Sequence, residues 1–301
     1  MSIIPSIPIP LMRMLLLLVL LILPAIGGAE PLRVFVSVLP QKTFVEKIGG
    51  DHVAVRSMVR PDHNPATYDP TPKQIAALAH TDLYLRIGVP FEEAWMARIR
   101  AANPDLRVVD IHGGMDLRTM EQHDHSGDGR HLGEGHDTSE LDPHVWTSPR
   151  YVKQMAAIVR DALTALAPAN SGDFERGYRA FAAELDNLDR EIRALLKDLP
   201  SRKFMVYHPA WGYFADTYSL TQVPVEKEGK EPGARTLTTL INQAKREGLK
   251  VIFVQPQFDT KSAAQVAHAI DGQLVVIDPL SADYIDNLRA VARQIAEAAK
   301  R

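Results

Sequence analysis

The sequence predicts an α/β fold of two lobes, each with a mainly parallel sheet flanked by helices, joined by one long rigid helix. Short apolar runs alternate with amphipathic segments in both halves of the 301-residue chain, which is typical of parallel sheets covered by helices. Between the halves, one apolar stripe at helical spacing continues for about 27 residues and would span about 40 Å. The composition, 46% hydrophobic and 24% charged, is that of a globular chain long enough for two modest cores.

Four strands and three helices are predicted between residues 33 and 111, in the first half of the chain. The strands are expected over residues 33–38, 53–58, 82–87 and 106–111, and the helices over 41–48, 71–79 and 91–102. Thr71 can cap the second of these helices, with Pro72 at its first position. A further helix is expected over 148–166, because Ser148 can cap it and Pro149 would be at its first position. We therefore predict an N-terminal metal-binding lobe over residues 30–171.

The second half repeats the alternation after the long helix, which we predict over 172–199. The apolar stripe of that helix consists of Phe174, Tyr178, Phe181, Leu185, Leu188, Ile192 and Leu195. Strands are expected over residues 203–207, 220–225, 250–255 and 273–277, and helices over 210–218, 235–247, 260–270 and 282–300. We predict a C-terminal metal-binding lobe over 200–301, with ligand sites at the carboxyl ends of strands and between the lobes.

The first 29 residues are typical of a cleavable signal peptide. One basic residue, Arg13, precedes an apolar run over 14–26, and the small residues Gly27, Gly28 and Ala29 follow it. The run has about 13 residues, whereas a membrane-spanning helix needs about 20. We expect cleavage near Ala29 and a mature protein free in the periplasm.

The chain has no cysteine, so any transition metal must be held by nitrogen and oxygen donors. Its net charge is −3, and the scattered Lys and Arg residues give no basic patch of the kind that binds nucleic acid. The eleven histidines are the unusual feature of the composition.

Three candidate metal ligands lie where strands end or helices begin. His144 precedes a predicted helix, His208 follows the apolar strand that ends at residue 207, and Asp278 follows the strand that ends at 277. Alone, each is more often a satisfied surface His or a turn Asp than a ligand. Together, two neutral imidazoles and a carboxylate are a suitable but incomplete ligand set for tetrahedral Zn²⁺.

The mature chain, essentially from end to end, resembles the solute-binding subunits of zinc and manganese ABC importers, known as cluster A-I. Four segments carry the resemblance by their order and spacing: Pro61-Asp-His-Asn-Pro-Ala-Thr-Tyr-Asp-Pro70, Asp142-Pro-His-Val-Trp146, Tyr207-His-Pro-Ala-Trp-Gly-Tyr213 and Ile277-Asp-Pro-Leu280. The resemblance implies that His144, His208 and Asp278 are metal ligands. Histidine rather than glutamate at position 208 implies the zinc type. It also implies Zn(II) capture without catalysis and delivery to a membrane permease, and we expect a monomer.

The first segment departs from the family pattern. The family usually has a ligand His in Pro-His-Ser/Thr-Tyr/Phe-Glu-Pro, and here the matching residue is Ala66. An alanine methyl group cannot coordinate a metal. His63 lies three residues earlier on the same predicted loop, and we hypothesise that it replaces the missing ligand; the alternative is a site of three protein ligands completed by water.

Residues 121–140 are rich in Gly, Asp and His and lack apolar periodicity, so they are predicted to form a loop that interrupts the first lobe. Zinc-type members of the family often carry a His-rich loop here. The resemblance implies an auxiliary role in collecting metal for His123, His125, His131 and His136. The alternative is a solvated linker whose histidines bind nothing tightly.

Two other functions remain open at this point. One alternative keeps the same scaffold with Mn²⁺ or Fe²⁺ as the cargo, although a site for a hard cation would be expected to contain more carboxylate. A secreted zinc hydrolase would also use three protein ligands and a water. The sequence contains no His-Glu-x-x-His segment and no nucleophile elbow, which disfavours the hydrolase.

Overall fold

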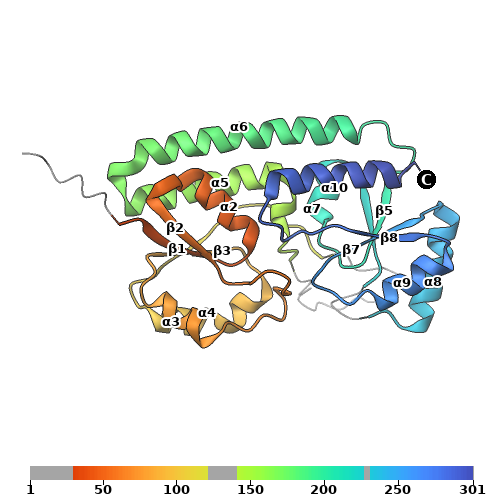
Figure 1. The fold of residues 1–301 in the computed structure, drawn as a ribbon, viewed down its shortest axis with the longest axis horizontal. Coiled ribbons are helices and arrows are strands. Elements are labelled where there is room, and N and C mark those ends of the chain that lie inside the picture. Colours follow the sequence, from red (N-terminus) through yellow and green to blue (C-terminus); the bar gives the residue numbers. More distant parts are fainter. Residues whose placement is uncertain (1–29, 121–140, 227–230, 301) are drawn as a thin grey trace, which may run out of the picture. The chain divides into compact units, whose positions relative to one another are not determined.

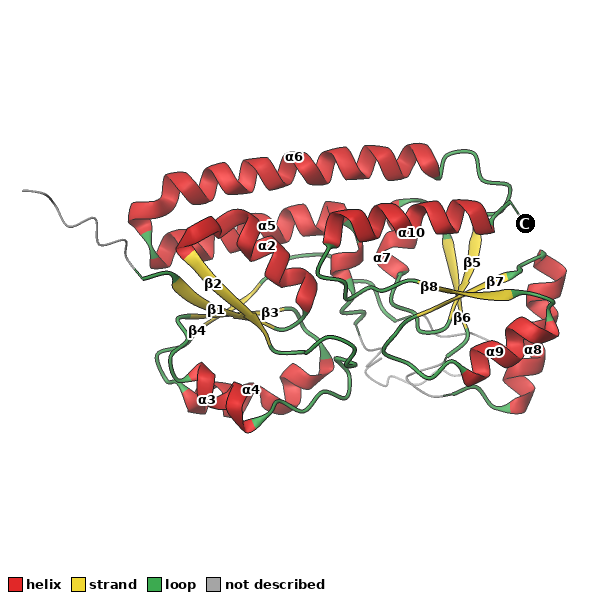
Figure 2. Ribbon diagram, in the orientation of Figure 1, coloured by secondary structure: helices red, strands yellow, loops and turns green. Residues whose placement is uncertain are grey.

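The computed structural model of the chain describes residues 30–120, 141–226 and 231–300. The described part contains two sheets of four strands each, and every pair of neighbouring strands is parallel (Figure 1). Helices flank both sheets (Figure 2). The predicted α/β class with two parallel sheets is confirmed.

The first sheet has the strand order β2-β1-β3-β4. Its strands are β1 (Leu32–Val36), β2 (Val53–Ser57), β3 (Leu83–Arg86) and β4 (Arg107–Asp110). The accompanying helices are α2 (Leu39–Gly49), α3 (Pro72–Leu78) and α4 (Pro90–Ala102). As predicted, the side chain of Thr71 accepts a hydrogen bond from the backbone of Gln74, and Pro72 opens α3.

The second sheet repeats this order as β6-β5-β7-β8. Its strands are β5 (Lys203–Val206), β6 (Thr221–Pro224), β7 (Val251–Val254) and β8 (Gln273–Val276), and its helices are α7 (Gly212–Thr217), α8 (Ala234–Glu247), α9 (Lys261–Ala269) and α10 (Tyr284–Ala298). The chain leaves β5 toward one edge and reaches β7 on the other side. In such sheets, the carboxyl ends of the two strands where the order reverses are the usual ligand position.

Alternate side chains of β5 and β7 enter different apolar cores, because successive residues of a strand point to opposite faces. Phe204 and Phe253 belong to a core that extends through α10 to the first sheet. Met205 and Ile252 belong to a second core, which contains residues of α8 and α9. Both faces of the central strands are therefore covered, which explains why these strands are almost wholly apolar.

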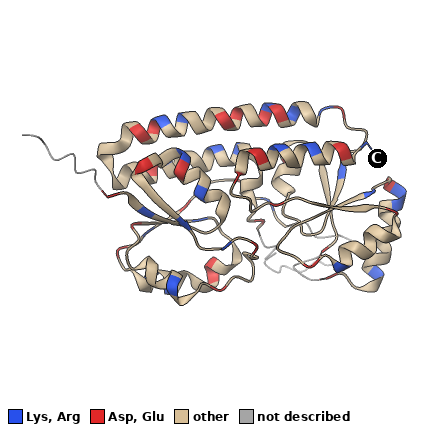
Figure 3. Ribbon diagram, viewed as in Figure 1, with Lys and Arg blue, Asp and Glu red and all other residues tan. Residues whose placement is uncertain are grey.

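Two long helices follow the first sheet, α5 (Pro149–Leu166) and α6 (Ser171–Leu195). The helix α6 joins the two lobes and contacts α2, α5 and α10. Phe174, Phe181 and Leu188 of its predicted stripe are fully buried, and acidic and basic residues are interspersed along the helix (Figure 3). It ends at Leu195, four residues before the predicted end at 199. Leu199 precedes Pro200, a position that disfavours helical backbone.

In the parts of the chain that the structure covers, no helix has both the length and the apolar character needed to cross a membrane. The predicted signal peptide over residues 1–29 lies outside the described residues.

Candidate metal centre

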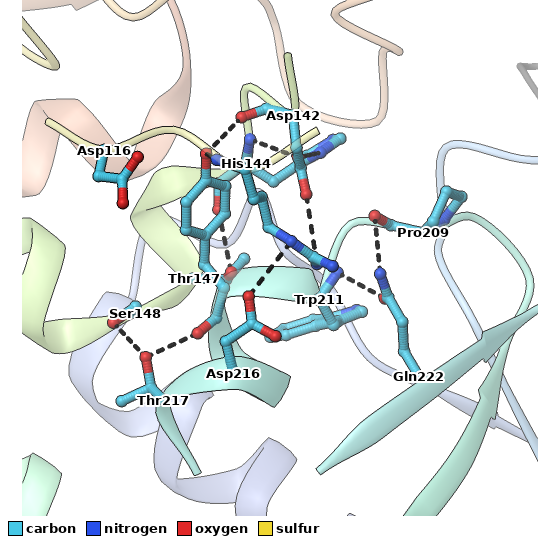
Figure 4. A network of polar contacts seen from close by, with 12 residues as sticks. Asp116, Asp142, His144, Thr147, Ser148, Pro209, Trp211, Asp216, Thr217 and Gln222 are labelled. Carbon is cyan, nitrogen blue, oxygen red and sulfur yellow. Dashed lines mark hydrogen bonds and ion pairs between the residues drawn. The ribbon is translucent and has the colours of Figure 1, made fainter. Parts of the chain in front are cut away.

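His144 is held by a buried carboxylate two residues earlier. Its backbone N–H donates to Asp142 Oδ1 over 3.0 Å, and its ring Nδ1 lies 2.7 Å from the same oxygen. Asp142 is 1% exposed, so the contact is shielded from water. Because a carboxylate oxygen accepts, Nδ1 carries the proton and the lone pair is on Nε2, the tautomer that binds a metal through Nε2. Figure 4 shows the two side chains side by side.

His208 follows β5 and has a similar carboxylate partner. Its Nδ1 lies 3.1 Å from Glu226 Oε2, and the Glu226 side chain is 3% exposed. Gln255 fixes the backbone of His208 by accepting from its N–H over 3.3 Å and donating to its carbonyl over 2.9 Å. The ring of Phe258 stacks on the imidazole with centroids 4.5 Å apart. His208 is therefore also oriented with Nε2 available to a metal.

The structure brings the two imidazoles together. The ring centroids of His144 and His208 are 5.3 Å apart, with 73° between the ring planes. Two imidazoles sharing a tetrahedral Zn²⁺ at about 2.0–2.1 Å would have ring centres about 5 Å apart. The side chains of His144 and His208 are 13% and 14% exposed, so the pair is mostly buried yet still reachable from solvent. The spacing thus fits a shared zinc ion.

The electrostatic surroundings keep His208 neutral. Burial lowers the pKa of His208 below its ordinary value of 6.5, and this effect outweighs the hydrogen bond to Glu226, which raises the pKa. The nearby imidazole of His144 lowers it further. A neutral imidazole is the form that coordinates a metal, so at pH 7 His208 needs no proton loss before binding.

Asp278 lies directly after Ile277, at the end of β8, and its Oδ1 accepts from Gln257 Nε2 and from the backbone N–H of Leu280, both over 2.9 Å. The indole of Trp146 donates to the carbonyl of Pro279 over 2.7 Å, which ties this segment to the one that carries His144. Nevertheless, no three His, Asp or Glu side chains among the described residues converge on a position for a cation. Asp278 is therefore not grouped with the imidazole pair.

His63 is engaged within its own exposed loop. Its Nδ1 lies 2.8 Å from the carbonyl of Pro61, and its Nε2 lies 3.0 Å from the guanidinium of Arg60. Ala66 is also exposed, and its N–H donates to Asn64. The structure does not place His63 with the imidazole pair, and its role as a replacement ligand stays a prediction.

The proposed auxiliary ligands lie outside the residues that the structure describes; they are His123, His125, His131 and His136. The described residues on either side of this segment meet in an antiparallel bridge between Thr119 and Leu141. Both ends of the segment are therefore fixed next to the 142–144 turn.

Sequence reasoning missed several polar residues of the second sheet. Glu226 and Gln255 follow β6 and β7, just as His208 and Asp278 follow β5 and β8, so the carboxyl end of every strand of this sheet is followed by a polar side chain. The rule that led to His208 and Asp278 would have found the other two. Gln257 and Phe258 lie on a loop and carry no comparable signal.

Comparison with known proteins identifies the family. A family model described as ZnuA, zinc-uptake complex component A periplasmic, matches residues 34–298. The chain belongs to the ZnuA family. It is 26% identical over 253 residues to the high-affinity zinc uptake system protein ZnuA of Bacillus subtilis (strain 168), covering 83% of this chain and 79% of the relative. It is also 27% identical over 269 residues to a putative metal-binding protein of Chlamydia muridarum, covering 88% of this chain and 91% of that protein.

Solved structures of the ZnuA family share the fold. A crystal structure of ZnuA superimposes with a TM-score of 0.82 at 39% identity, over 89% of this chain and 99% of that one. A ZnuA deletion mutant crystallised with zinc bound gives a TM-score of 0.81 at 40% identity, over 89% and 98%. The resemblance drawn from the four sequence segments is confirmed.

Proposed function

We propose that this chain captures Zn²⁺ in the periplasm and delivers it to the permease of an ABC importer. The observation that carries the proposal is the pair of imidazoles, His144 and His208, each held at Nδ1 by a buried carboxylate with their ring centres 5.3 Å apart. Family membership supports the transport role. The proposed leader over residues 1–29 would direct the chain to the periplasm, where it would act as a monomer.

The proposed ligands are Nε2 of His144 and of His208 and one oxygen of Asp278. Gln257 and the Leu280 N–H bind Oδ1 of Asp278, so Oδ2 is the oxygen that can reach a metal without breaking them. A modest movement of this segment toward the imidazoles on metal binding would complete three ligands. Two imidazoles and one carboxylate favour Zn²⁺ over Mn²⁺, which prefers oxygen donors.

The arrangement supports binding rather than catalysis. The two buried carboxylates next to the imidazoles, Asp142 and Glu226, each hold an Nδ1 proton. A zinc hydrolase would need a carboxylate placed to take a proton from metal-bound water. Both carboxylates are already engaged in orienting the ligands, which supports zinc as the transported substrate.

Competition between metals tests the proposed function. Metal-stripped protein titrated in a calorimeter should bind one tight equivalent of Zn²⁺ at the imidazole pair, and a large excess of Mn²⁺ should fail to displace it. The physical reason is the nitrogen-rich ligand set. Tighter binding of Mn²⁺ or Fe²⁺ would instead assign the chain to a hard-cation cargo, and absence of any tight site would contradict the proposal.

His63→Ala tests the replacement of the ligand missing at position 66. We predict that zinc affinity falls about tenfold or more, because His63 would give up two exposed hydrogen bonds, each contributing about 0.5–1.5 kcal/mol, for a metal bond that contributes more. His80→Ala is the control, since His80 is also exposed. Unchanged affinity in His63→Ala, measured against a zinc chelator, would show that His63 does not replace the missing ligand.

A further inference from the structure

The carboxylate that orients His144 has a second partner, Arg118. Oδ1 of Asp142 faces His144, whereas Oδ2 lies 3.7 Å from Arg118 Nη1. The Arg118 side chain is 18% exposed and that of Asp142 is 1% exposed. A carboxylate this deeply buried requires a compensating cation or further hydrogen bonds, because removing an unpaired charge from water is strongly unfavourable.

The main chains of Arg118 and Asp142 are also joined. The N–H of Asp142 donates to the carbonyl of Arg118 over 2.9 Å. The hydroxyl of Tyr213 accepts from the Arg118 N–H over 3.1 Å and donates to the Asp142 carbonyl over 2.9 Å. These contacts fix the backbone of Arg118 relative to that of Asp142, so the guanidinium extends toward the Asp142 carboxylate from a fixed Cα position.

Three residues of helix α7, Gly212, Tyr213 and Asp216, lie next to the guanidinium of Arg118. Asp216 Oδ2 lies 3.3 Å from Arg118 Nε, and the Tyr213 ring lies beneath the guanidinium at 5.9 Å. A Cβ at Gly212 would lie 1.2 Å from Arg118 Nη1 and 3.0 Å from Asp142 Oδ2. Only glycine at 212 therefore leaves room for the ion pair. Gly212 lies four residues after His208, so the position that contacts the guanidinium belongs to the same segment as the other imidazole.

We propose that Arg118 is a positioning residue for the metal centre: its guanidinium, seated against Gly212, holds Asp142, and Asp142 holds the Nδ1 proton and the ring orientation of His144. The proposal deepens the proposed function and rests on it. Without the cation, the buried Asp142 carboxylate loses its fixed orientation, and His144 loses its fixed tautomer. Zinc affinity then falls although no ligand has been removed.

Three variants and one control test this role. Arg118→Met removes the charge and keeps an apolar stem, Arg118→Lys keeps a charge, and Gly212→Ala displaces the guanidinium while leaving Arg118 in the chain. Arg160→Met is the matched control, because Arg160 also pairs with carboxylates and lies over a tyrosine ring, Tyr178, with a 24% exposed side chain. Zinc affinity is measured by competition with a chelator.

Arg118→Met and Gly212→Ala are expected to weaken zinc binding about tenfold, the lower end of the range for outer-shell partners of metal ligands. Arg118→Lys should restore most of the loss, and Arg160→Met should bind zinc as the native chain does. Equal zinc affinity in Arg118→Met, Gly212→Ala and Arg160→Met would overturn the proposal.

A second measurement uses metal-free protein. The ¹⁵N shifts of the His144 ring, assigned by its loss in His144→Asn, report which nitrogen carries the proton. We expect the Nδ1–H form in the native chain and in Arg118→Lys, and a mixture of tautomers in Arg118→Met and Gly212→Ala. This measurement distinguishes the positioning role from the proposed function. If the tautomer changes in Arg118→Met and Gly212→Ala but the native chain does not bind zinc, the positioning role is supported and the proposed function is contradicted. An unchanged tautomer in both variants would overturn the positioning role.

Discussion

Replacing His208 with alanine is expected to lower the affinity for Zn²⁺ at least about a hundredfold. Zinc binding to a four-ligand site is associated with about 10–16 kcal/mol, or about 3 kcal/mol for each ligand, and each 1.4 kcal/mol corresponds to a tenfold change. The substitution also removes a partner of Glu226, a side chain that is 3% exposed. Competition with a chromophoric chelator at pH 7.5 measures the loss.

His268→Ala is the matched control for this substitution. His268 lies in α9, at the surface of the same lobe, and is exposed. Its removal should leave zinc affinity unchanged. Thermal unfolding of both variants without metal separates loss of a ligand from loss of the fold. Native-like zinc affinity in a folded His208→Ala protein would exclude His208 as a ligand.

Zinc affinity is expected to be nearly constant from pH 8 to pH 7 and to fall once the pH passes below the pKa of His208, which itself lies below the ordinary His value of about 6.5. A proton competes with zinc for Nε2 of each imidazole. Burial lowers the pKa of His208, so its contribution to the fall begins at lower pH than for an exposed histidine. Each protonating imidazole costs at most about tenfold in affinity per pH unit.

The same pKa direction affects the stability of the metal-free protein. The folded-state pKa of His208 lies below its unfolded value, so the folded state binds fewer protons and the stability present above about pH 6.5 declines as the pH falls. Zinc titrations at several pH values, with unfolding measured in parallel, check both effects. An affinity independent of pH between 5 and 8 would argue against coordination by histidine.

The fold was predictable from the sequence because apolar periodicity directly reports which faces are buried. The strands around Met205 and Ile252 are apolar on both faces, and the structure covers both faces. The stripe of α6 likewise corresponds to buried residues such as Phe181 and Leu188. The end of α6 shows the largest difference, four residues, because Pro200 disfavours helical backbone at Leu199 although the apolar residues continue to that position.

The candidate site was only partly predictable. Strand ends indicated His208, and the four segments indicated His144, because both depend on local sequence. Arg118 escaped notice because its role depends on a contact with Gly212, 94 residues away in the sequence, and on a space that a glycine leaves. Glu226 was within reach of the strand-end rule, whereas the engagement of His63 by Arg60 and Pro61 depends on loop geometry.

A zinc-bound crystal structure with anomalous scattering at the zinc edge tests whether the imidazole pair coordinates the metal. We expect one strong zinc peak within about 2.0–2.2 Å of Nε2 of His144, Nε2 of His208 and an oxygen of Asp278. Nδ1 of the two imidazoles should remain on Asp142 and Glu226. A zinc ion held by other residues, while His144 and His208 make no contact with it, would contradict zinc binding at the imidazole pair.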